Sequence, residues 1–170
     1  RYFQGYSADC LSKERTARYA NPQGGYIHAM HQALWGDMHY KITGRTKDGK
    51  LEYVGGWQNN RPSEMHREIR FIENIFEELD SPDEWFYDDM EGYLYYYPPQ
   101  GEDMSHSVYE VAGLKNLLTL QGTADEPVRH LIFSGIEFRH AGRTFMEQME
   151  PVLRSDWCIY RGGAVFLEGT

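Results

Sequence analysis

Three short apolar segments recur in the last third of the chain, and each contains or ends at a glycine. They are LLTLQG at residues 117–122, LIFSGIEF at 131–138 and AVFLEG at 164–169. Recurring units of this kind are typical of solenoids, because a single coil cannot bury its own apolar face. Ordinary sheets packed as a β-sandwich could supply the same segments, so the pattern alone leaves both folds open.

The solenoid interpretation makes a specific prediction about stacking. Leu118, Ile132 and Val165 should lie next to one another in neighbouring parallel strands. These residues should also share one core with the other apolar residues of the three segments. The predicted core comprises Leu118, Leu120, Ile132, Phe133, Ile136, Phe138, Val165 and Phe166.

The earlier part of the chain predicts a different kind of β structure, built from hairpins. The turn KDGK at 47–50 contains Asp-Gly, a strong hairpin signal. A second turn at 88–92 separates two aromatic runs and places Trp85 in a hairpin core. The other predicted elements are a helix at 12–19 capped by Ser12, strands at 26–31, 38–43, 51–54, 84–87 and 93–97, and a strand passing into a helical turn at 69–79.

The charge and composition of the chain narrow its possible partners. It carries 26 acidic and 17 basic residues, a net charge of -9, without the basic stripe of a nucleic-acid-binding surface. No run approaches the roughly 20 apolar residues of a membrane span. Aromatic residues make up 15% of the chain, including 13 Tyr and 4 Trp. We therefore expect no nucleic-acid partner and no membrane span. A neutral sugar fits such an aromatic, acidic surface, and cationic partners stay open.

The residue types that ligate metals show no spacing typical of a metal site. Two cysteines, Cys10 and Cys158, are too few for a disulfide framework or a four-cysteine zinc site, and they could pair only if the fold brings them together. On a strand, His-x-x-His places its two rings on opposite faces. We expect neither a metal nor a cofactor, and histidines that form hydrogen bonds within loops or contact a sugar. The histidines concerned are His28, His31, His39 and His66.

One family resemblance spans nearly the whole chain. The stretch FIENIFEELDSPDEWFYD at 71–88, continued by LYYYPP at 94–99, resembles a segment of bacterial right-handed parallel β-helix proteins, many of them glycoside hydrolases. Four further segments resemble the same group: 24–31 (GGYIHAMH), 55–61 (GGWQNNR), 135–140 (GIEFRH) and 153–164.

This resemblance implies an all-β fold of two parts. Residues 1–104 would be a β-sandwich-like domain inserted near the start of the β-helix, and residues 105–170 would be the first resumed coils, incomplete in this chain. It also implies a secreted or periplasmic protein whose catalytic carboxylates lie on later coils. Both ends of the chain look cut from something longer, so the remainder of the parent chain is an expected partner.

Loop residues with aromatic and amide side chains are the candidates for sugar contact. Trp57 is followed by Gln58, Asn59, Asn60 and Arg61 in a loop without a strand or helix pattern. An aromatic face packs against sugar C–H groups, and neighbouring amides and guanidiniums bind the hydroxyls. Bracing of the loop by a buried tryptophan is the alternative. The predicted substrate-binding residues are His31, Trp35, Trp57, Asn59, Asn60, Arg61, Arg154 and Trp157.

Glycoside hydrolysis requires two carboxyl groups on either side of the scissile bond. The polar interruption from 139 to 161 offers Glu147, Glu150 and Asp156 as weak candidates, near several arginines that would keep them ionised. A solvated loop with exposed ion pairs is the alternative. The acidic pairs at 77–78 and 88–89 are predicted to be exposed turn charges.

Three functions are consistent with these observations. The first is part of a secreted glycoside hydrolase that degrades polysaccharide. The second is a non-catalytic carbohydrate-binding or scaffold segment. The third is a polysaccharide lyase, since the β-helix is shared by both enzyme classes and a fold does not determine a function.

Overall fold

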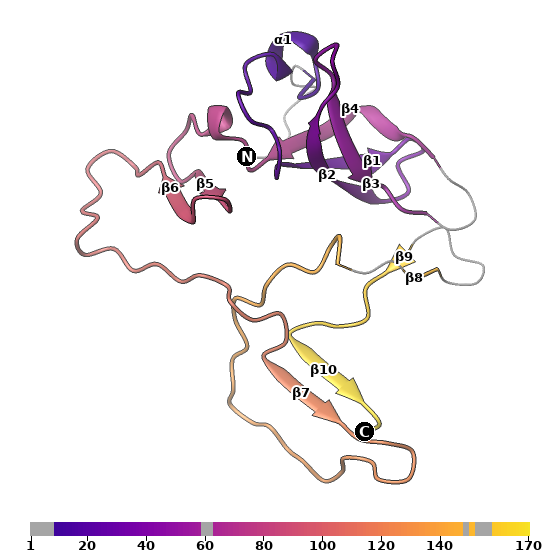
Figure 1. Cartoon of the computed structure of the whole chain (residues 1–170). Helices are drawn as coiled ribbons and strands as arrows, with labels where there is room; N and C mark the ends of the chain where they lie inside the picture. The colour runs from indigo at the N-terminus through magenta and orange to yellow at the C-terminus, as the bar shows by residue number, and fades with distance from the viewer. Residues whose placement is uncertain (1–8, 59–62, 148–149, 152–157) are drawn as a thin grey trace. The chain divides into compact units, whose positions relative to one another are not determined.

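The computed structural model describes residues 9–58, 63–147, 150–151 and 158–170. Its described part is mostly β structure with one short helix, so the all-β prediction is confirmed (Figure 1). The chain divides into two compact units. Unit 1 comprises Arg1–Ser107 with Pro151–Cys158, and unit 2 comprises Val108–Glu150 with Ile159–Thr170. The predicted domain boundary at residue 104 stays a prediction.

A four-stranded antiparallel sheet forms the centre of unit 1. Its strands are β1 (Tyr26–His31), β2 (Asp37–Arg45), β3 (Leu51–Gly55) and β4 (Met65–Glu73), in the order β3-β2-β1-β4. The strands predicted at 26–31, 38–43 and 51–54 and the turn at 47–50 are confirmed. Along β1 and β2, buried and more exposed residues alternate, as they do in a strand with one face on a core.

The core lies on one face of this sheet. On β1, Ile27, Ala29 and His31 are buried, and β2 contributes Met38, Tyr40 and Ile42 in the same alternation. Ile27 and Ile42 are fully buried. The residues that complete the cluster come from strand β4 and from segments outside the sheet: Met65, Tyr19 and Ile75. The described core is therefore covered by loop and helix-flanking residues, and a second sheet facing the first, as in a sandwich, is not shown.

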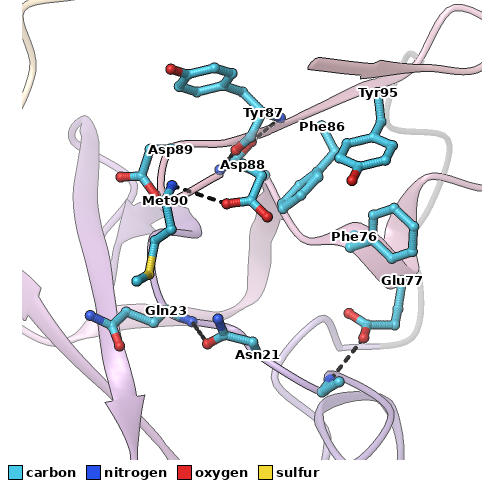
Figure 2. Close-up of a pocket in the computed structure, with 12 residues that line it drawn as sticks. Asn21, Gln23, Phe76, Glu77, Phe86, Tyr87, Asp88, Asp89, Met90 and Tyr95 are labelled. Carbon is cyan, nitrogen blue, oxygen red and sulfur yellow. Dashed lines mark hydrogen bonds between the residues drawn. The ribbon is translucent and has the colours of Figure 1, made fainter. Parts of the chain in front are cut away.

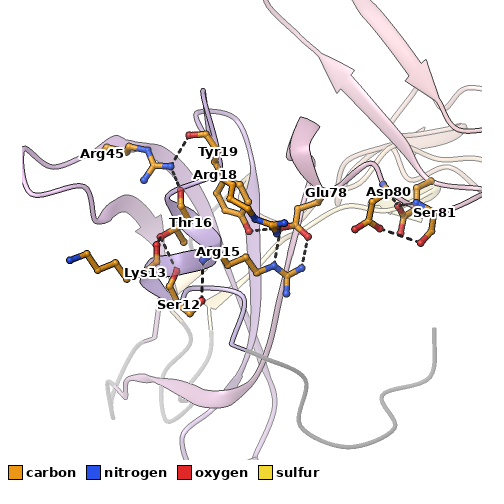
Figure 3. A network of polar contacts seen from close by, with 11 residues as sticks. Ser12, Lys13, Arg15, Thr16, Arg18, Tyr19, Arg45, Glu78, Asp80 and Ser81 are labelled. Carbon is orange, nitrogen blue, oxygen red and sulfur yellow. Dashed lines mark hydrogen bonds and ion pairs between the residues drawn. The ribbon is translucent and has the colours of Figure 1, made fainter.

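The short helix α1 (Lys13–Thr16) is joined to the 3-10 turn η1 (Phe76–Glu78) through Glu78. Ser12 caps α1 as predicted, accepting the Arg15 N–H at 3.2 Å. The Glu78 carboxylate accepts hydrogen bonds from Arg15 (Nε at 2.8 Å, and Nη2) and from the Tyr19 hydroxyl at 2.7 Å, and Arg18 lies 3.4 Å away (Figure 3). Its side chain is 14% exposed.

This network makes the prediction of an exposed turn charge wrong for Glu78. Burial disfavours the charged carboxylate, but the hydrogen bonds from Arg15 and Tyr19 outweigh it and hold the pKa of Glu78 below its usual value. Burial and the same carboxylate raise the pKa of Tyr19. Sequence reasoning missed the contact because its partners lie about sixty residues apart in the chain.

The second hairpin of unit 1 is confirmed, with β5 (Trp85–Asp88) antiparallel to β6 (Tyr93–Tyr96). In its turn, Asp88 Oδ1 accepts the N–H groups of Met90 and Glu91, as Asp does in many turns. The expected core position of Trp85 is wrong, since this side chain is 60% exposed. A two-stranded hairpin buries at most one face, and Trp85 lies on the other.

In unit 2, β7 (Leu118–Gln121) pairs in parallel with β10 (Val165–Glu168), and Leu118 lies opposite Val165 as predicted. The pairing continues at the glycines that follow both strands. Gly122 N donates to Glu168 O at 2.9 Å, and Val128 N donates to Gly169 O at 3.0 Å. The remaining strands, β8 (Glu150–Pro151) and β9 (Cys158–Ile159), form a short two-stranded pair.

The rest of the stacking prediction is wrong. Residues 131–138 form no strand, and Ile132 is 91% exposed. The eight apolar residues share no core, because Phe133, Ile136, Phe138 and Val165 are exposed as well. A strand requires a hydrogen-bonded neighbour, and this segment has none among the described residues. Closed coils of a parallel β-helix are therefore not shown.

Candidate functional site

His31 and Trp35, two of the predicted sugar-binding residues, are brought together where β1 turns into β2. Their rings stack almost parallel, with centroids 5.4 Å apart and an interplanar angle of 3°. His31 is buried at 7% exposure, whereas Trp35 is 59% exposed. The pair is thus an anchored imidazole beneath an aromatic ring that reaches solvent.

The turn between the two strands holds the imidazole in place. Nδ1 of His31 accepts the Ala33 N–H at 2.8 Å, and the main chain of His31 bonds to Gly36 and Leu34. Because Nδ1 accepts, a neutral His31 ring carries its proton on Nε2. The orientation of the ring that supports Trp35 is therefore determined locally.

Trp57, the centre of the predicted sugar-binding loop, is half-buried just after β3. The start of this loop is braced by Gln58, whose side chain donates to Met38 Sδ at 3.1 Å and accepts the Ser63 N–H. Asn59, Asn60 and Arg61 lie outside the described residues, as do Arg154 and Trp157. The role of this loop stays a prediction.

Of the three catalytic candidates, only Glu147 has a described side chain. Its carboxylate pairs with Lys115 Nζ at 2.7 Å, and both side chains are exposed, at 38% and 51%. Asp156 and the side chain of Glu150 lie outside the described part of the chain. An exposed pair of this kind is also what the solvated-loop alternative predicts.

The other sheet face of unit 1 carries two neighbouring imidazoles. His28 and His39 are direct cross-strand partners, with ring centroids 4.6 Å apart, and His28 stacks on Phe71. His28 lies 3.0 Å from Glu73, and His39 lies 3.3 Å from Asp37. Burial, and then the nearby His28, lower the pKa of His39 against the opposing effect of the two carboxylates.

These histidines lie in strands, so their expected place in loops is wrong. His66 also lies in a strand, β4, where its Nδ1 accepts the Glu68 and Ile69 N–H groups. His28 and His31 lie on opposite faces, as strand geometry requires. Within the described part of the chain, no group of three or more His, Cys, Asp or Glu side chains is arranged to hold a metal ion.

Sequence reasoning missed a cleft of about 280 Å³ in unit 1, between the turn after α1, the turn around η1 and the second hairpin (Figure 2). One side is aromatic, since Phe76 meets Phe86 edge to face at 5.5 Å and Tyr95 at 5.3 Å. Figure 2 shows Asp89 and Met90 across from these rings. The full lining is Ala20, Asn21, Gln23, Asn74, Phe76, Glu77, Phe86, Tyr87, Asp88, Asp89, Met90 and Tyr95.

Two side chains hold the walls of this cleft together. Asn74 Nδ2 donates to Tyr87 O at 3.1 Å and its Oδ1 accepts the Tyr87 N–H at 3.0 Å, which fixes the hairpin to the end of β4. Glu77 Oε1 accepts the Ala20 N–H at 2.8 Å. Asn74 has a left-handed backbone (φ 54°), a conformation that its sequence neighbourhood does not announce.

Cys10 is a buried free thiol of unit 1. Burial, and then the nearby Asp9 carboxylate, raise the pKa of Cys10 to about 11. A thiol with a raised pKa is a poor nucleophile at neutral pH, so Cys10 belongs to the packing.

No protein-family model matches the chain, and no curated protein or solved structure matches it either. Among the described residues, no helix is long and apolar enough to cross a membrane. The proposals below therefore rest on the geometry and chemistry of the described side chains.

Proposed function

We propose that the chain is part of a carbohydrate-active protein and that Trp35, stacked on His31, is its contact with sugar. The observation that supports this most directly is the stack itself. A half-exposed tryptophan whose ring is held by a buried, hydrogen-bonded imidazole loses little freedom when it binds a ligand.

The chemistry of the pair suits a pyranose ring. The indole face packs against the axial C–H groups of a sugar, while polar groups nearby exchange hydrogen bonds with its hydroxyls. The turn between β1 and β2 offers main-chain polar groups, and the predicted Trp57 loop would add amide and guanidinium groups. Aromatic side chains that are rigid and partly exposed are typical anchors of binding surfaces.

The wider proposal is that unit 2 contributes coils to a right-handed parallel β-helix of a secreted glycoside hydrolase. Its support is the parallel pairing of β7 with β10 and the stacking of Gly122 on Gly169. A Cβ on Gly122 would lie 2.6 Å from Gly169 O, so the two turns approach too closely for any other residue. On this proposal the exposed apolar residues of unit 2 pack against further coils, which carry the catalytic carboxylates.

A non-catalytic carbohydrate-binding or scaffold segment is the alternative proposal. Both proposals include the Trp35 contact with sugar. They differ only in whether further coils carry catalytic carboxylates. The two therefore predict the same binding behaviour for the 170-residue chain.

Binding of neutral oligosaccharides tests the shared part of the proposal. We expect Trp35→Ala to weaken binding about thirtyfold, because an aromatic anchor at a desolvated contact contributes about 2 kcal/mol. The measurement is titration calorimetry with xylo-, cello- and manno-oligosaccharides. Trp85→Ala is the matched control, since Trp85 is exposed to the same degree (60% against 59%) on a different hairpin.

Either of two results contradicts the proposal. One is that no oligosaccharide of the panel binds the unchanged chain. The other is that Trp35→Ala and Trp85→Ala weaken binding equally, which would indicate unspecific contact with exposed aromatic residues. Thermal unfolding of both variants shows whether the fold is kept.

A further inference from the structure

Two imidazoles face each other on the side of the unit 1 sheet that lies away from its core. His28 of β1 and His39 of β2 are direct cross-strand partners, and their rings meet edge to face with centroids 4.6 Å apart. Phe71 of β4 stacks on the His28 ring at the same distance. Both histidines are partly buried. Because three paired strands carry these rings, the sheet itself holds the two imidazoles together.

Each imidazole has a carboxylate beside it. Glu73 on β4 places an oxygen 3.0 Å from Nε2 of His28, and Asp37 on β2 places one 3.3 Å from Nε2 of His39. In the other direction along β4, the same face carries the apolar Ile69. Both carboxylate side chains reach solvent, so water weakens their attraction for positive charge. A second charge on the pair would therefore meet the first at close range, with only screened carboxylates to offset it.

A lysine on the same face opposes a second positive charge. Lys41 follows His39 two residues later on β2, and its ammonium lies over the Tyr26 ring at 6.0 Å. On β3 the partner of Lys41 is the apolar Val54, with Glu52 further along the strand. The ammonium of Lys41 adds positive charge to this face, so it disfavours a second proton on the histidine pair.

Proton binding at His39 is linked to the stability of the fold. Burial, and then the nearby His28, lower the pKa of His39 in the folded chain, and the carboxylates of Asp37 and Glu73 oppose this only in part. In the unfolded chain the two rings are apart, and histidine titrates near about pH 6.5. His39 therefore binds its proton less readily in the folded state than in the unfolded state. The fold loses no stability from this group above about pH 6.5, and it loses stability as the pH falls below that value.

The pair lies in the same hydrogen-bonded ladder as the turn between β1 and β2. Two residue pairs separate it from the turn, which the His31 N–H closes by donating to Gly36 O at 2.7 Å. Like charges directly opposite each other destabilise an antiparallel strand pair. Repulsion between His28 and His39 therefore weakens the pairing that holds this turn closed.

We propose that His28 and His39 form an acid-sensitive lock on the β1–β2 hairpin. At neutral pH the pair carries at most one proton, and the two strands stay paired. In mildly acidic solution both imidazoles are charged, and the hairpin opens more often. The lock concerns the hairpin and not a ligand, so it goes beyond the proposed function and does not depend on it.

Histidine ring signals in NMR spectra test whether the two imidazoles interact. In His28→Gln, the His39 ring should titrate at a higher pH than in the unchanged chain, because the neighbour that opposes its proton is gone. The control is His106, an exposed histidine 2.7 Å from Asp103, which should titrate alike in both proteins. An unchanged titration of His39 in His28→Gln overturns the proposal.

Hydrogen exchange at the amides of β1 and β2 measures how often the hairpin opens. Between about pH 7 and 5, above the range in which ordinary carboxyl groups titrate, protection factors should fall about fivefold in the unchanged chain, the effect of like charges on opposite residues of a strand pair. His39→Gln should keep its protection over this range, because a second charge cannot form. Asp37→Asn changes a side chain that is 67% exposed, and it should lose more protection than the unchanged chain, since it removes a carboxylate that favours a charged His39.

His106→Gln is the matched control for the exchange measurement. It also removes a histidine beside a carboxylate but leaves the pair intact, so it should keep the acid response. A loss of protection in acid that persists in His39→Gln overturns the proposal. So does a loss that disappears in His31→Gln and not in His39→Gln, which would assign the response to the buried histidine of the turn. Equal protection at both pH values, in the unchanged chain and in Asp37→Asn, overturns it as well.

Discussion

The four-stranded sheet of unit 1 and the apolar segments of unit 2 contain similar residues, which are buried in unit 1 and exposed in unit 2. Ile27 and Ile42 in the sheet are fully buried, whereas Ile132 and Ile136 in unit 2 are 91% and 56% exposed. A sheet of four strands has a face wide enough to be covered by Tyr19, Met65 and Ile75. Two strands alone have no such face, and a two-stranded sheet is marginally stable in water.

The two regions also differ in how their strands are joined. β1 and β2 follow each other through a short turn, while β7 and β10 are parallel and therefore need a long crossover. Ordering that crossover costs conformational entropy, which in unit 2 few buried contacts offset. Apolar sequence therefore indicates where a core can form, and the number of paired strands decides whether it does.

The largest expected difference between the regions is the cost of truncating an isoleucine. Ile42→Ala should lower the free energy of unfolding of unit 1 by about 2–5 kcal/mol, because it leaves a cavity in a core without exposure to water. Ile132→Ala should change stability by no more than about 0.5 kcal/mol. Urea denaturation followed by circular dichroism measures both, and hydrogen exchange assigns the loss to β1 and β2.

An equal loss of unfolding free energy in the two variants would show that Ile132 is buried in solution. The contrast between a buried core in unit 1 and exposed apolar residues in unit 2 would then be contradicted, and the closed-coil interpretation of unit 2 would gain support. Unchanged unfolding free energy in both variants would mean that the sheet of unit 1 does not depend on its core.

Much of the secondary structure could be predicted from the sequence, because local signals determine it. Asp-Gly at the first turn, Ser12 as a cap and the alternation along β1 each act within a few residues. Pairing over long distances had no such signal. The parallel register of Leu118 with Val165 was found only through the glycines that end both segments, and the same pattern wrongly extended to Ile132.

The candidate site was predicted less well, for a related reason. His31 and Trp35 are close in sequence, and their stacking follows from one turn. The acidic cleft combines segments around residues 20, 76 and 88 that carry no shared motif. The sequence gives its carboxylates the pattern of ordinary turn charges. Glu77 and Glu78 are adjacent, but the fold brings arginines to Glu78 and the Ala20 N–H to Glu77.

A second, smaller expected difference between the two units is the effect of a substitution at Gly122, where β7 and β10 of unit 2 end in close contact. A Cβ on Gly122 would lie 2.6 Å from Gly169 O and 2.7 Å from Val128 N, both main-chain atoms that cannot move aside easily. Gly122→Ala should therefore cost about 1–3 kcal/mol. Hydrogen exchange should become faster at 118–121 and 165–168 and stay unchanged at 26–31. Gly113→Ala is the control, since its Cβ would meet nothing within 4 Å. Unchanged exchange in Gly122→Ala would show that β7 and β10 do not stack in solution.

The smallest expected difference is in the response of the two units to acid. In unit 1 the ion pairs of Glu78 and Asp9 are partly buried, and both pKa values lie below their usual range. The hydrogen bonds from Arg15 and Tyr19 lower the pKa of Glu78 against the effect of burial. The hydrogen bond from Arg70 is the main cause of the lowered pKa of Asp9. In unit 2 the pair of Glu147 with Lys115 is exposed and contributes little.

The sign of the pH effect follows from these directions. A carboxyl group with a lowered pKa in the folded state stabilises the fold fully above its unfolded pKa, about 4.3 for Glu and 3.9 for Asp, and loses this contribution as the pH falls through the folded value. The stability of unit 1 should therefore fall as the pH drops below about 4.3.

Glu78→Gln should lower the stability of unit 1 at pH 7 and flatten this fall, because its side chain no longer titrates. Glu147→Gln should leave the curve of unit 1 unchanged. Urea denaturation across this pH range, with exchange at β1 and β2 as the local readout, measures both. An equally steep fall in Glu78→Gln would show that the buried contact with Arg15 does not form in solution, and the electrostatic contrast between the two units would be lost.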